Sequence, residues 1–168
     1  SQTISGMSFS PNTLAVGGTT TVSASGGASG NPVVFSSTTP GICTVSGNVV
    51  SSIAAGSCTI AADQAGNSNY GAAAQVTQTI TTGAAAQVIT FGTAPTIAVG
   101  GTGTVSATGG GSGNPVTFSS NTASICTLSG STVTGVVAGT CTIAAAQAGN
   151  NNYNAATATQ SFAIVMAN

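Results

Sequence analysis

The sequence contains no lysine, arginine or histidine, and its only acidic residue is Asp63. Charged residues make up 1% of the 168 positions, whereas ordinary soluble domains are about one quarter charged. General acid–base catalysis needs a titratable group near the working pH, and a serine or threonine nucleophile needs an adjacent base. The sequence therefore predicts that the chain is not an enzyme and has no catalytic residues.

The same shortage of charge argues against several kinds of binding site. Affinity for nucleic acids comes mainly from lysine and arginine side chains that neutralise phosphates. Calcium sites draw on several carboxylates, and zinc sites need more clustered ligands than well-separated pairs of thiols can supply. We expect no cofactor, no metal and no nucleic-acid partner.

Long hydrophobic runs are also missing, because no apolar run reaches the ~18 residues of a membrane span. The longest is Phe-Ala-Ile-Val-Met-Ala at 162–167. It departs from strict alternation, which predicts a strand buried on both faces. Phe162, Ile164 and Met166 would share one side, and we consider them a candidate strand donated to a neighbouring molecule.

Disorder is disfavoured despite the many glycine, serine and alanine residues. Disordered segments combine low hydrophobicity with high net charge. This chain is 41% hydrophobic, has a formal net charge of −1 and has a mean hydropathy of +0.42. The composition is therefore that of a folded chain.

What the sequence does contain is an internal repeat. The string G-S-C-T-I-A-A-D-Q-A-G-N-S-N-Y at 56–70 returns as G-T-C-T-I-A-A-A-Q-A-G-N-N-N-Y at 139–153, 83 positions later. Repetition at a fixed offset indicates one fold used twice. We expect one domain over 1–82, a linker at 83–86 and a second domain over 87–168.

The four cysteines form two pairs with the same spacing, Cys43 with Cys58 and Cys126 with Cys141. We interpret each pair as a disulfide within one repeat, formed in an oxidising compartment. The alternative, a cytosolic metal or redox pair, lacks a Cys-x-x-Cys spacing and helper ligands. A bridge that closes a loop of about 15 residues contributes roughly 3 kcal/mol in the chain-entropy model.

Short β-prone runs alternate with glycine, proline, asparagine and serine, a pattern typical of a β-sandwich. Differences between the copies identify outward positions: Val34 becomes Thr117, whereas the valine and phenylalanine on either side do not change. Because side chains alternate along a strand, the unchanged ones face inward. The sequence predicts an all-β chain with about seven strands per domain, in the first copy at 2–9, 19–25, 32–37, 43–46, 49–53, 58–63 and 75–81.

A known family shares these motifs. The strings C-T-V-S-G and Q-A-G-N-x-N-Y, with A-V-G-G and G-N-P-V upstream, resemble bacterial immunoglobulin-like repeats, which occur in tandem in large secreted and cell-surface proteins. The resemblance covers both copies nearly end to end. It implies two tandem immunoglobulin-like β-sandwich domains that act as a spacer, stalk or assembly module.

Two segments of each copy could carry a ligand. Gly-Gly-x-Ser-Gly-Asn-Pro, at 26–32 and 109–115, lacks the lysine and following helix of a phosphate-binding loop, so we expect an ordinary loop. The second segment ends in Asn-x-Asn-Tyr and offers candidate loop contacts, for sugars above all, at Asn69, Tyr70, Asn152 and Tyr153. The structural alternative, which we favour, is a tyrosine that closes the end of the sandwich.

An almost uncharged surface lacks the repulsion that keeps molecules apart, and a β-sandwich has edges that accept further strands. We therefore expect a structural subunit of an extracellular homopolymeric fibre or filament, with the chain itself as partner. The alternative is a stalk or carbohydrate-binding segment of a large bacterial cell-surface adhesin, with glycans as partners. An ice-binding surface would need regular threonine rows, and the threonine tracts are irregular.

Overall fold

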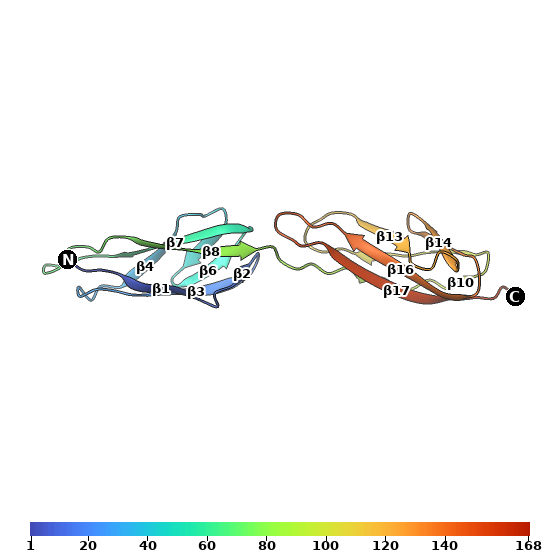
Figure 1. The fold of residues 1–168 in the computed structure, drawn as a ribbon, viewed down its shortest axis with the longest axis horizontal. Helices are drawn as coiled ribbons and strands as arrows, with labels where there is room; N and C mark the ends of the chain where they lie inside the picture. The colour runs from blue at the N-terminus through green and yellow to red at the C-terminus, as the bar shows by residue number, and fades with distance from the viewer. The chain divides into compact units, whose positions relative to one another are not determined.

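The computed structural model describes all residues from 1 to 168 and consists of strands and loops. None of its elements is a helix long and apolar enough to cross a membrane. The chain divides into two compact units, Ser1–Ala85 and Ala86–Asn168, which we call domain 1 and domain 2 (Figure 1). Each unit is a sandwich of facing sheets, so the predicted fold class, two tandem immunoglobulin-like β-sandwich domains, is confirmed.

Domain 1 has one sheet of order β1-β3-β6-β5 and a second of order β2-β8-β7-β4. The first strand is split between the sheets, because β1 pairs antiparallel with β3 while β2 pairs parallel with β8. The short β2 is the element that sequence reasoning missed. The strands are β1 Ser5–Ser10, β2 Leu14–Ala15, β3 Thr19–Ser25, β4 Val33–Ser37, β5 Cys43–Ser46, β6 Val49–Ser52, β7 Gly56–Gln64 and β8 Val76–Gly83.

Domain 2 repeats this arrangement with one sheet interrupted. The sheet β10-β17-β16-β13 matches the second sheet of domain 1, whereas the other is divided into β11-β15-β14 and β12-β9. The strands are β9 Thr90–Phe91, β10 Ile97–Ala98, β11 Thr102–Thr104, β12 Ala107–Thr108, β13 Val116–Ser120, β14 Cys126–Ser129, β15 Thr132–Gly135, β16 Gly139–Gln147 and β17 Ala156–Val165.

A disulfide crosses the core of each domain, as the cysteine spacing predicted. Cys43 bonds Cys58, and Cys126 bonds Cys141, with S–S distances of 2.02 and 2.00 Å and no exposed surface on any of the four. Each bridge joins the two sheets of its sandwich, so it fixes the facing layers together around the apolar core.

The run at 162–167 is not buried on both faces, and that expectation was wrong. Ile164 is 2% exposed and belongs to the core of domain 2, but Val165 is 46% exposed and Met166, beyond the end of β17, is 79% exposed. The outer face of this sheet lies in solvent, so β17 alternates like the other strands. The exposed, outward positions of this strand are Thr157, Thr159, Ser161, Ala163 and Val165.

Candidate functional site

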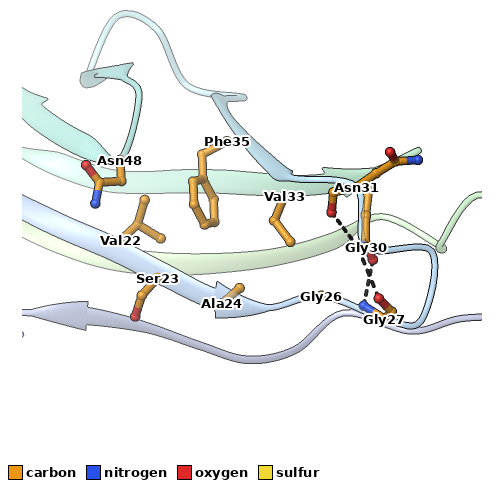
Figure 2. A pocket seen from close by; sticks show the side chains of 11 residues that line it. Val22, Ser23, Ala24, Gly26, Gly27, Gly30, Asn31, Val33, Phe35 and Asn48 are labelled. Atoms are coloured by element: carbon orange, nitrogen blue, oxygen red, sulfur yellow. Dashed lines mark hydrogen bonds between the residues drawn. The ribbon is translucent and has the colours of Figure 1, made fainter. Parts of the chain in front are cut away.

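Each domain has a cleft along one side of its sandwich, with a volume of about 480 Å³ in domain 1 and about 470 Å³ in domain 2. In domain 1 its walls come from β3, from β4 and from the glycine-rich loop between them (Figure 2). Figure 2 shows Phe35 and Val33 pointing from β4 toward β3, with Phe35 beside Val22, so these side chains give the cleft an apolar floor.

The cleft exists because the two sheets end at different places. The register of β6 on β3 covers only Thr19, Thr20 and Thr21. Beyond it a single backbone bond continues the pairing, from the amide of Val22 to the carbonyl of Asn48 at 2.9 Å. In the opposite sheet β4 is the last strand. The end of β3 and the whole of β4 therefore flank an opening that no further strand covers.

One end of the cleft is closed by a buried glutamine that sequence reasoning missed. Gln64, 3% exposed, accepts a hydrogen bond from the amide of Gly27 at 2.7 Å and donates one to the carbonyl of Asn31 at 2.7 Å. A Cβ on Gly26 would collide with the amide group of this side chain. The glycine-rich loop is thus an ordinary loop whose glycines make room for a glutamine.

The corresponding glutamine of domain 2 is held in the same way. Gln147 is also 3% exposed, accepts from the amide of Gly110 at 2.7 Å and donates to the carbonyl of Asn114 at 2.8 Å. The alternation of inward and outward side chains along the strand could have predicted that both glutamines are buried. Gln64 has the same parity as Cys58 and Ile60, so it lies on the inward side of its strand.

The predicted loop contacts lie beside this closed end. Asn67 donates to the carbonyl of Ser29 at 3.0 Å and its side-chain oxygen accepts from the amides of Asn69 and Tyr70 at 2.9 and 3.0 Å. Asn69 itself is exposed and Tyr70 is half-buried. The loop is therefore tied to the glycine-rich loop, and much of its hydrogen-bonding capacity is already used.

Domain 2 holds its tyrosine differently. Asn150 accepts from the amides of Asn152 and Tyr153, both at 2.9 Å, which repeats the turn of domain 1. The ring of Tyr153 occupies the space where a Cβ on Gly111 would stand. Tyr153 and Asn152 are both half-buried, so the ring packs on its own domain over part of its surface.

The candidate donated strand lies far from the cleft in the sheet order and is used within its own domain. Phe162 is opposite Cys141, and Ile164 is opposite both Gly139 and Ile97. Donating this strand would require it to leave the core that it helps to fill. Met166 comes after the strand and has no place in that core.

The remaining polar features offer no reactive cluster. Asp63 is exposed and accepts two hydrogen bonds from Gln75, at 3.1 and 3.0 Å. Nowhere do three or more histidine, cysteine, aspartate or glutamate residues come together as metal ligands would.

The edge strands beside the clefts have backbone groups without a strand partner. The amide of Thr38 bonds the carbonyl of Thr59 at 3.0 Å, so by alternation the backbone groups of Val33, Phe35 and Ser37 point away from β7. In domain 2 the amide of Asn121 bonds the carbonyl of Thr142 at 2.9 Å. The matching outward positions there are Val116, Phe118 and Ser120.

No family model and no curated protein matches this sequence. The solved structures that are similar to it in fold include an intimin fragment, an N-cadherin and a protocadherin. A C-terminal 282-residue fragment of intimin, in complex with the intimin-binding domain of the translocated intimin receptor, is 21% identical, covers 97% of this chain and 64% of its own, and has a TM-score of 0.37. Drosophila N-cadherin EC1-4 is 8% identical, with 90% and 46% covered and a TM-score of 0.32.

The third is a set of extracellular cadherin domains 1–4 of protocadherin gamma B7, 11% identical, with 98% of this chain and 50% of that chain covered and a TM-score of 0.32. This chain thus spans less than two thirds of each of these structures. At such identities the likeness concerns the fold alone.

Proposed function

We propose that this chain is a structural module outside the cytoplasm, not an enzyme, and that copies of it assemble into a fibre. The observation that carries the proposal is the repeated, disulfide-bridged sandwich with uncharged strand edges in both domains. Structural disulfides persist in oxidising compartments, which favours an extracellular or cell-surface location. With a net charge of −1, copies repel each other weakly.

A second candidate is a stalk segment of a large bacterial cell-surface adhesin, and the path of the chain through each domain favours it. At one end of domain 1, Gln2 donates to the carbonyl of Ala65 at 3.0 Å and accepts from the amide of Ser29 at 2.9 Å. The last strand ends at the opposite end of this domain, where Gly83 accepts from Val16 (Figure 1). A domain that the chain enters at one end and leaves at the other works as a spacer.

Glycan binding at the loop contacts is less well supported, because Tyr70, Asn152 and Tyr153 are half-buried. The neighbouring Asn67 and Asn150 are committed to hydrogen bonds within their own loops. A glycan array with the parent chain and the Asn152→Ala, Tyr153→Ala variant checks this alternative. We expect no glycan signal that depends on these two side chains.

The fibre proposal is tested by electron microscopy and sedimentation of the purified, oxidised chain over a wide range of concentration. We expect filaments that grow in number with concentration. Single copies at every concentration would contradict the fibre and leave the stalk. Reduced thiols in native material, measured by mass spectrometry after alkylation, would contradict the extracellular location for both candidates.

A further inference from the structure

We infer that copies of this chain join through their free edges, with β4 or β13 of one copy pairing with β4 or β13 of the next. The inference rests on the fibre form of the proposed function and names the surface that would build it. The two strands are the last in their sheets and have a neighbour on one side only. Three residues in each turn their amide and carbonyl groups away from the one neighbouring strand.

These two edges lack the devices that usually prevent edge pairing. Native sheets protect their edges with lysine, proline, bulges or inward-pointing charges. The registers of β4 on β7 and of β13 on β16 run without interruption, and neither strand contains proline or a charged residue. By contrast, the edge strand β1 has an irregular register between Ser5 and Ser8. The β4 and β13 edges are therefore open. The edges of β5 and β14 are also unprotected, but each is four residues long and none of their residues lines either cleft.

The cleft beside each edge provides room for side chains of an added strand. Strand addition takes its affinity from main-chain hydrogen bonds and its specificity from pockets for alternate side chains. Here the inward-facing Val33 and Phe35 are half-buried, so they offer apolar surface to a strand laid alongside β4. A strand that places apolar side chains at alternate positions fits this floor.

A second copy of the chain supplies such a strand. The edge sequences are Val-Val-Phe-Ser-Ser in β4 and Val-Thr-Phe-Ser-Ser in β13, each with valine and phenylalanine two positions apart on one face. Neither edge carries a charge, so pairing them buries no unpaired ion, whereas a charged peptide would have to lose its hydration in an uncharged cleft. The chemistry of the site therefore selects another uncharged edge.

The internal repeat makes each copy bivalent. Because both domains present the same kind of edge, a copy bound through one edge still has the other edge free. Contacts that leave a free site at each end produce open chains, whereas a single self-complementary site stops at a dimer. With two equivalent edges on each copy, strand pairing between copies can continue and build a polymer.

Lysine substitutions at the outward positions of the two edges test this inference. Val34→Lys and Thr117→Lys place a charge on exposed side chains of β4 and β13, and the matched controls Ser57→Lys and Thr140→Lys place it on exposed positions of the central strands β7 and β16. Sedimentation should show dimers for each single edge variant, monomers for the double variant and parent-like polymers for the controls. Polymers of the double edge variant would overturn the edge assignment.

Hydrogen exchange gives a second readout that distinguishes strand pairing from general stickiness. In the assembled material the amides of Val33, Phe35 and Ser37 should exchange about tenfold or more slowly than in the monomer. The amides of Val34 and Ser36 already face β7 and should change little. Filaments without this alternation would overturn edge pairing but leave the fibre, whereas a parent chain that never assembles would overturn both.

Discussion

Domains 1 and 2 fill the same corner of their cores with different side chains. In domain 1 the corner holds Ser52 and Thr82, 7% and 2% exposed, whose hydroxyl groups have no hydrogen-bond partner. In domain 2 the matching residues are Gly135 and Ile164, and a Cβ on Gly135 would lie 2.8 Å from Cγ2 of Ile164. In domain 2 the larger isoleucine fills the space that the missing side chain of Gly135 leaves empty. The total side-chain volume at the two positions is therefore kept when both residues change together.

The strands β3 and β11 differ in the same compensated way. In domain 1 the hydroxyl of Thr20, which is 3% exposed, donates to the carbonyl of Pro11 at 2.6 Å. Domain 2 has Gly103 in place of this threonine, and a Cβ there would collide with Pro95 and Ile97. The disulfide and the buried glutamine stay constant between the domains, whereas the filling of the space around them varies.

The disulfides should contribute the largest stability term, equally in both domains. Replacing Cys43 and Cys58 by alanine should lower the free energy of unfolding of domain 1 by about 3 kcal/mol, because the unfolded chain regains the freedom of the closed loop. The sequence has two tyrosines, Tyr70 and Tyr153, one in each domain, so in the Tyr153→Phe background urea unfolding followed by tyrosine fluorescence reports on domain 1. The same bridge removed from domain 2 is the matched control, and an unequal loss would contradict the equivalence of the two bridges.

The buried glutamines should rank second. Gln64→Ala leaves the amide of Gly27 and the carbonyl of Asn31 without partners inside the cleft wall, which should cost about 2 kcal/mol. Gln147→Ala should cost the same in domain 2, and Gln78→Ala, at an exposed position of β8, should cost almost nothing. The urea midpoints of the three variants, each made in a background with a single tyrosine, measure these losses of stability. A negligible loss for Gln64→Ala would show that water replaces the hydrogen bonds of the glutamine.

Replacing Ser52 and Thr82 of domain 1 by the matching residues of domain 2 should raise the free energy of unfolding of domain 1 by a smaller amount. The double variant Ser52→Gly, Thr82→Ile removes two unpaired hydroxyl groups and should stabilise domain 1 by about 1 kcal/mol. Thr82→Ile alone should destabilise it, since in domain 2 a Cβ at Gly135, which matches Ser52, would lie 2.8 Å from Cγ2 of Ile164. The coupling between the two changes, measured as a double-mutant cycle, should lie within about 0.5–3 kcal/mol; additive effects would contradict a shared volume.

The smallest effect is expected at the only acidic residue. Asp63 and Gln75 bond each other on the exposed face of domain 1, where domain 2 has Ala146 and Thr157. Asp63→Ala should therefore change the free energy of unfolding by less than about 0.5 kcal/mol. A loss above about 1 kcal/mol in the same urea assay would mean that this surface pair holds β7 and β8 together.

Much of the fold could be predicted from the sequence because its signals are local or repeated. Alternation at Val34 and Thr117 predicted which side of the strand faces the core, and cysteine spacing predicted both disulfides. The split first strand could not be predicted, since two residues, Leu14 and Ala15, carry too little pattern to identify a change of sheet. The cleft was missed because it depends on where β6 stops relative to β3, a long-range property of the sheet.

The parallel pairing of the first and last strands has a consequence for a chain under tension. In domain 1 the amide of Val16 bonds the carbonyl of Gly83 at 3.0 Å, and in domain 2 the amide of Val99 bonds the carbonyl of Val165 at 2.9 Å. A pull on the two ends of a domain slides these strands along each other, so their bonds share the load instead of opening one by one. Once they yield, the residues enclosed by each disulfide stay locked, and the domain releases less length than its sequence contains.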